Sequence, residues 1–293
     1  MHVVIRALGV LMAAAWLAGC ATGFPRATAP YAAEDGLDGA AVLARGVDAH
    51  GGDLRTRAAD LNYASDGRWE SLIQRIQPVV TDAGYRVTAE TRYAPAQGLH
   101  AIRYQGPKGI KQVVRRPGDI EVYYDGVRTT DPEILQAAAM TTDAFELFHF
   151  GPSFLAARAT QATRMADVDD AGTRYQRVRV EIAPGFGEAA NDTVIAWFDA
   201  QTHLLHRVHL TLNGFPSTQG AHVDTTMTGY RALDGVMLPT RFHERVRGPL
   251  RIDAHTWWVT GLDAGRGWTA GDVAEGGFNG SAARPADVLR ERD

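Results

Sequence analysis

Short segments in which apolar and polar residues alternate make up most of the chain. In residues 119–126, Ile120, Val122 and Tyr124 share one side, while the residues between them are mainly polar. A period of two is that of a β-strand whose two faces have different surroundings. Segments of this kind, rich in β-branched and aromatic residues, predict antiparallel strands at 85–93, 99–104, 110–116, 119–126, 173–182, 193–199, 203–212, 222–230, 240–246 and 255–262.

Two segments have the spacing of helices instead. Asp38 is a suitable N-cap for a short helix that Gly51-Gly52 would end. Asp131-Pro132-Glu133 combines an N-cap, a proline at the first helical position and an acid in the first turn. An apolar stripe follows as far as Gly151-Pro152, and it predicts helix in one piece or two. The stripe, which favours core packing over a ligand surface, consists of Ile134, Ala138, Thr141, Phe145 and Phe148.

The first twenty residues have the pattern of a bacterial export signal. Arg6 precedes an apolar run at 7–16 that is too short to span a membrane. Leu17-Ala18-Gly19-Cys20 then resembles the lipobox of bacterial lipoproteins at all four positions. In that family the signal is cleaved before the cysteine, which is acylated, and two acyl chains hold a protein on a bilayer. The alternative is an ordinary secretory signal that ends in cysteine by chance.

The lipobox resemblance implies a cellular location for the protein and a division of the chain into segments. Ala21, rather than aspartate, follows the cysteine, so we expect an outer-membrane lipoprotein that faces the periplasm. We expect a signal peptide at 1–19, a lipidated Cys20 with a tether at 20–38, and one domain at 39–265. A tail at 266–293, rich in glycine, alanine and charge, is expected to be loosely ordered, with a short helix near 286–291.

Composition excludes several classes of function. Cys20 is the only cysteine of the 293 residues, so no intramolecular disulfide can form. A net charge of −4 gives no reason to expect a nucleic-acid partner.

The loop 213–220, with Phe215 near its tip, could touch a membrane or hand over a ligand, or it could be a plain turn whose phenylalanine packs inward.

The three histidines of HLLHRVH, at positions 203, 206 and 209, raise the possibility of a metal site. In a strand they divide between the two faces, and His203 lies roughly 20 Å from His209 at ~3.3 Å per residue. His206 is then the one polar group on a face with Leu204, Val208 and Leu210. Convergence with His222 or His243 from other strands is the remaining alternative. Since no catalytic motif is complete either, we expect no metal, no cofactor and no enzymatic activity.

Two longer segments resemble a known family. WFDAQTHLLHRVHLTL (197–212) and YRALDGVMLPTRFHERV (230–246) look like the C-terminal half of the lipoprotein-sorting (LolA/LolB-like) half-barrel superfamily. Asp48-Ala49-His50-Gly51-Gly52 is similar to the end of the first helix in relatives, and the resemblance covers roughly 40–262. It implies an α+β fold, mainly antiparallel β, in which a curved unclosed half-barrel sheet has helices that cap the concave face. The lipobox makes the chain more similar to the membrane-anchored acceptor than to the soluble carrier.

The resemblance also implies a function. The superfamily binds acyl chains of lipids or lipoproteins on its concave face, so lipid, the membrane and other lipoproteins or envelope proteins are the expected partners. The alternatives are an interaction or sensing module with a packed core, and an enzyme with converging histidines or carboxylates. The expected walls of a hydrophobic cavity, taken from apolar strand faces, are Ile120, Val122, Val178, Val180, Ile182, Leu204, Val208, Leu210, Trp257 and Val259.

Overall fold

One large antiparallel sheet forms the framework of the protein. The computed structural model describes residues 23–26, 31–57 and 59–284. Thirteen strands follow the order β6-β5-β4-β3-β2-β1-β15-β14-β11-β10-β9-β8-β7, and a separate hairpin joins β12 to β13. The strands are β1 (Leu61–Trp69), β2 (Thr88–Ala94), β3 (Leu99–Gly106), β4 (Gly109–Arg116), β5 (Asp119–Tyr124), β6 (Val127–Arg128), β7 (Ala159–Asp170), β8 (Thr173–Ile182), β9 (Asp192–Asp199), β10 (Leu205–Thr211), β11 (His222–Thr228), β12 (Arg231–Leu233), β13 (Val236–Leu238), β14 (Arg241–Gly248) and β15 (Ile252–Ala264).

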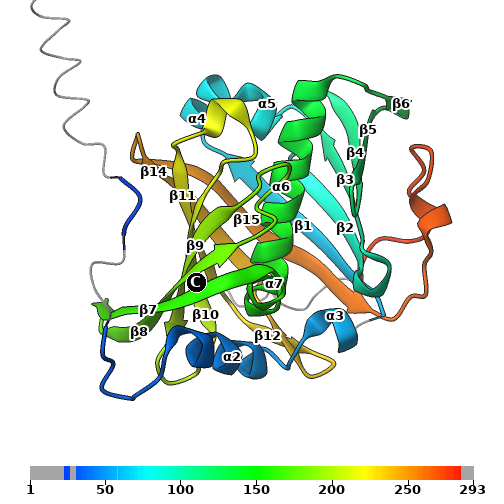
Figure 1. The fold of residues 1–293 in the computed structure, drawn as a ribbon. Coiled ribbons are helices and arrows are strands. Elements are labelled where there is room, and N and C mark those ends of the chain that lie inside the picture. The colour runs from blue at the N-terminus through cyan, green and yellow to red at the C-terminus, as the bar shows by residue number, and fades with distance from the viewer. Residues whose placement is uncertain (1–22, 27–30, 58, 285–293) are drawn as a thin grey trace, which may run out of the picture.

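The sheet curves around a long helix and does not close. In Figure 1, α6 runs along the concave side while the strands bend around it, and the edge strands β6 and β7 lie apart. The fold is therefore the predicted α+β half-barrel with helices on its concave face. The helices are α2 (Gly39–Ala49), α3 (Leu54–Arg57), α4 (Ser71–Ile76), α5 (Pro78–Thr81), α6 (Pro132–Phe150) and α7 (Pro152–Arg158), with 3-10 turns η1 (Pro95–Gln97), η2 (Pro216–Thr218) and η3 (Ala270–Val273).

Both predicted helices form with the predicted caps. The Asp38 side chain accepts a hydrogen bond from the backbone N–H of Ala41, and the Asp131 side chain accepts one from that of Glu133. Gly151, at φ 51°, ends α6, and Pro152 begins α7, so the second helical segment consists of two pieces. No helix within the described ranges is long and apolar enough to cross a membrane.

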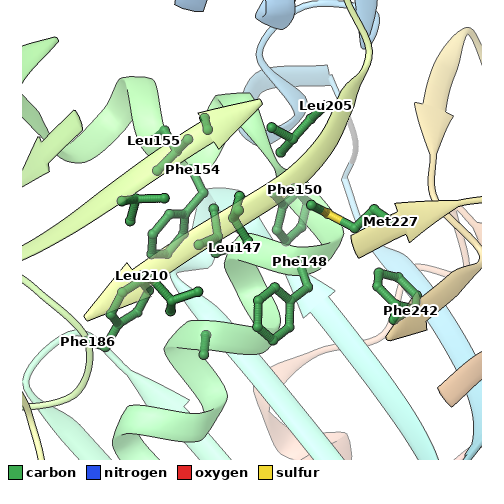
Figure 2. Close-up of a cluster of buried hydrophobic side chains, with 14 of the residues drawn as sticks. Leu147, Phe148, Phe150, Phe154, Leu155, Phe186, Leu205, Leu210, Met227 and Phe242 are labelled. Atoms are coloured by element: carbon green, nitrogen blue, oxygen red, sulfur yellow. The ribbon is translucent and has the colours of Figure 1, made fainter. Parts of the chain in front are cut away.

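The main core lies between the sheet and the helices α2, α6 and α7. Figure 2 shows apolar side chains of α6 and α7 directed toward the strands. The rings of Phe154 and Phe186 are nearly parallel, with their centres 5.9 Å apart. Leu147 on α6 and Leu155 on α7 have no exposed surface. The helices therefore fill a large part of the concave side with hydrocarbon.

The alternation predicted for the histidine-containing strand is interrupted. A β-bulge lies between Leu205 and Arg207, so Leu205 is buried together with Val208 and Leu210. His206, predicted on the apolar face, instead stacks on Tyr175 at 4.6 Å, on the face opposite Val178. A bulge of one residue moves every preceding side chain to the other face, which a strict period of two cannot predict.

Two of the long strands were not predicted at all. Strands β1 and β7 contain many polar residues, and neither shows a clear alternation. In β1 the side-chain oxygen of the buried Asn62 accepts a hydrogen bond at 3.0 Å from Nε1 of Trp268, which is far away in the sequence. A strand that meets polar partners from distant segments has no local hydrophobic pattern.

The segment after β15 packs on the outer face of the sheet over its described part, 266–284. Trp268 and Val273 are buried against Leu99, Ala101 and Val114, and a capping box joins Thr269 to Asp272. This packing differs from the loosely ordered tail that glycine content and charge predicted. The backbone N–H of Gly267 also donates to Asp60 at 2.8 Å, so hydrogen bonds fix the segment as well as apolar contacts. The helix predicted near 286–291 lies outside the described residues, as do Cys20 and the rest of the lipobox.

Candidate hydrophobic cavity

A cavity of about 470 Å³ opens at the end of the half-barrel that α4 and α5 cover. One wall is a stripe on α6, where Met140, Ala144 and Phe148 are spaced by four residues and therefore share a face. Thr141 and Phe145 extend this stripe. The volume of the cavity is in the range typical of cavities that hold small organic ligands.

The other walls come from segments that are far apart in sequence. Ile73 of α4 and Val80 of α5 lie on one side, and Val223, Val246 and Ala254 of β11, β14 and β15 form the sheet side. The loop after β10 contributes residues 217–221. Phe215 of this loop is buried, so the aromatic side chain packs inward and the following residues border the cavity. Most of the lining is thus apolar and suited to hydrocarbon.

Charged side chains are few in this lining. Within the described chain they are Arg86, which precedes β2, and Glu244 of β14. The Arg86 guanidinium lies 4.9 Å from the ring of Trp69, and its Nη1 donates a hydrogen bond to the carbonyl oxygen of Val80 at 2.6 Å. Burial raises the pKa of Glu244 to about 7, and the charge of Arg86 opposes that rise.

None of the ten residues expected to form the cavity walls lines this cavity. Seven lie together in the main core, namely Val178, Val180, Ile182, Val208, Leu210, Trp257 and Val259. Ile120 and Val122 pack with Ala138 under the first half of α6, while Leu204 is only partly buried. Trp257 also borders a separate hollow of about 20 Å³. Apart from Leu204, which precedes the bulge of β10, these residues do lie on the apolar side of their strands, but they pack into the core there.

Some residues that line this cavity were singled out in the sequence for other reasons. Thr141, Phe145 and Phe148 belong to the apolar stripe that favoured core packing, and residues 217–220 belong to the loop considered for ligand handover. The wall residues on α4 and α5 were not predicted, because these helices are short and their sequence lacks a full helical period. The proline at the start of α5 was the one local indication of a helix there.

A group of buried histidines and tyrosines lies beneath α6, beside the cavity. His149 stacks on Tyr63 at 4.3 Å between ring centres, and its Nδ1 is 2.8 Å from the hydroxyl of Tyr93. Burial lowers the pKa of His149 to about 3, and burial lowers the pKa of His100 well below its usual value. These rings are therefore neutral structural groups at neutral pH.

Acid should destabilise the fold through these histidines. Because the pKa of His149 is lower in the folded protein than its ordinary 6.5, stability is complete above that value and falls as pH drops toward 3. At about pH 5, His149 alone should cost about 2 kcal/mol. Between about pH 7 and about pH 5, the free energy of unfolding in urea should fall for both proteins. We expect the fall to be about 2 kcal/mol smaller for His149→Phe than for the wild type. Equal losses in the two proteins would show that His149 is not a source of the acid sensitivity.

Two histidines of neighbouring strands lie side by side, and a third lies beside a carboxylate. His209 Nε2 lies 2.7 Å from His222 Nδ1, and Phe24 packs over both rings. His243 Nε2 lies 3.0 Å from Asp253 Oδ1. In the part of the chain that the structure describes, no group of three His, Cys, Asp or Glu side chains could hold a metal ion.

Comparison with known proteins gives matches only among solved structures. No protein-family model and no curated protein matches the sequence. A LolA superfamily protein from Nitrosomonas europaea is 8% identical, with 78% of this chain and 94% of that chain covered at a TM-score of 0.47. A DUF1329 family protein from Desulfovibrio piger is 12% identical, with 80% and 96% covered at a TM-score of 0.44. A putative outer membrane lipoprotein-sorting protein domain from Vibrio parahaemolyticus is 8% identical, with 78% and 96% covered at a TM-score of 0.37. At these identities and TM-scores the similarity concerns the fold alone and says nothing of function.

Proposed function

We propose that the protein binds the acyl chain of a lipid or lipoprotein in the cavity beneath α4, α5 and α6, without catalysing a reaction. The observation that carries this proposal is the apolar lining of the cavity, which Met140, Ala144 and Phe148 form with the sheet. Hydrocarbon gains about 25 cal/mol for each Å² that leaves water, so such a wall favours an aliphatic ligand over a polar one.

The rim of the cavity is suited to the entry of a chain. Ile76 and Leu250 border the cavity and are 43% and 38% exposed. Large apolar side chains at the mouth of an apolar cavity give a chain a continuous path inward from the surface. They are also consistent with a helical cover, α4 and α5, over the entrance.

The cellular setting of the proposal comes from the sequence. The lipobox Leu17-Ala18-Gly19-Cys20 favours an acylated Cys20, anchorage in the outer membrane and a domain that faces the periplasm. Lipid or lipoprotein trafficking in the cell envelope is the role that combines such an anchor with an acyl-binding cavity. Lipoproteins or other envelope proteins would then be exchange partners.

Native mass spectrometry tests the cavity directly. The Cys20→Ser protein, purified from a periplasm, is expected to carry an extra mass that organic extraction releases as a fatty acid or phospholipid. A bare polypeptide mass, unchanged after incubation with phospholipid vesicles, would contradict the proposal. That outcome would favour the alternative of an envelope interaction module on the same fold.

Lipidation is tested separately, since Cys20→Ser should move the protein from the membrane fraction to the soluble periplasmic fraction.

A further inference from the structure

Two N–H donors at the buried end of the cavity have no hydrogen-bond partner. Arg86 is 5% exposed, and its Nε–H is unpartnered although Nη1 is bound to Val80. The Nε1–H of Trp69, on which the guanidinium lies, is also buried without a partner. Both residues line the cavity. Buried donors are nearly always satisfied in folded proteins, so an unpartnered pair inside a cavity indicates a missing acceptor.

Aromatic rings hold the guanidinium in place from the other sides. Its central carbon lies 5.0 Å from the ring of Tyr104 and 5.4 Å from the ring of Phe145. The carboxylate of Asp82, four residues earlier, is bound to Lys111 at 2.7 Å and to the Tyr124 hydroxyl at 2.8 Å. The positive charge of Arg86 is therefore fixed in position, in a residue that lines the cavity.

Glu244 is the acid that shares the cavity with Arg86. It faces His255 across the β14–β15 pair, and burial keeps the pKa of His255 well below its usual value, so that ring is neutral. The charge of Asp224 on β11 contributes to the raised pKa of Glu244. The Asp224 carboxylate itself is paired with Arg245 at 2.7 Å and with Arg247 at 3.4 Å. With the pKa of Glu244 at about 7, the lining changes from a net positive charge to neutral as pH rises through that value.

We propose that the ligand is a single-chain amphiphile with an anionic head, carboxylate or phosphate, which enters head first and binds Arg86 and Trp69. The chain then runs from the buried end to the rim at Ile76 and Leu250. The direction follows from exposure, because the cation is buried while the apolar rim residues are exposed. This inference rests on the proposed function, and it adds the class of ligand and its orientation. A fixed cation satisfies an anionic head through charge-assisted hydrogen bonds, which a neutral head cannot match.

Three dodecyl probes distinguish the possibilities on the wild-type protein. Laurate, dodecyl phosphate and dodecanol each contain twelve carbon atoms and differ in the head, and titration calorimetry gives their affinities. We expect at least one anionic probe to bind about tenfold or more tightly than dodecanol, and the stronger of the two identifies the head. Equal affinities would overturn the inference and leave the proposed function intact. If none of the three bound, the proposed function itself would fail.

Two variants locate the head within the cavity. Arg86→Met should abolish the preference for the anionic probes while dodecanol binding remains. For the wild type, laurate affinity should fall roughly three- to tenfold from about pH 6 to about pH 8, because Glu244 becomes charged and repels the head. Glu244→Gln, which keeps the shape of the side chain, should remove this decrease, whereas the exposed Glu188→Gln should retain it. A decrease that persists in Glu244→Gln, or a flat wild-type profile, would contradict the placement of the head.

Discussion

Replacing Leu147 by alanine is expected to lower the free energy of unfolding by about 2–5 kcal/mol. Leu147 lies in the last turn of α6 with no exposed surface, in the cluster that Figure 2 shows between α6, α7 and the strands. Its removal leaves a void enclosed by the sheet on one side and by α7 on the other. Neither can move inward without breaking strand pairing or the α6–α7 junction, so the void should persist.

The measurement is urea unfolding of the soluble domain followed by far-UV circular dichroism. Leu72→Ala on α4 is the matched control, because the same atoms are removed from a side chain that is 47% exposed. Surface substitutions of this kind usually change stability by less than about 0.5 kcal/mol. Similar losses in the two variants would show that α6 does not form the centre of the core, and would place the main packing elsewhere in the half-barrel.

The strands that alternate clearly could be predicted from sequence, and their reasons are local. In β8, Val178, Val180 and Ile182 are all fully buried, as their period of two predicts. The pattern identifies the apolar face of such a strand, but it does not say what covers that face. Here helices α2 and α7 pack on β8, so these three residues belong to a filled core, and the cavity lies at another part of the concave side.

The site depends on contacts between distant segments, which explains why it could not be predicted. Arg86 follows α5 in a stretch without periodicity, and its role emerges only where Trp69, Phe145 and Glu244 meet it from β1, α6 and β14. Glu244 looks like an ordinary polar residue of an alternating strand. Burial raises its pKa, and the alternation of the strand does not reveal that burial. A single sequence does not contain these pairings.

Enlarging Ala144 to leucine should narrow the cavity and weaken ligand binding. Ala144 is buried on α6 and lies in the cavity wall between Met140 and Phe148. The added carbons point into empty space, so stability should be unchanged or slightly greater. A ligand that competes for the same volume should lose about a hundredfold or more in affinity, since excluding several methylenes costs ~0.8 kcal/mol each.

The binding of a fluorescent fatty-acyl probe measures this effect, with Ala156→Leu on α7 as the control. Ala156 is exposed and does not line the cavity, so the same enlargement there should leave binding unchanged. Urea unfolding of both variants separates occlusion from misfolding, because an occluded protein binds no probe yet retains its stability. Undiminished binding by a stable Ala144→Leu protein would mean that the acyl chain occupies a different surface. In that case the apolar cavity would be a packing defect rather than the site of function, and the proposal of acyl-chain binding between α6 and the sheet would be wrong.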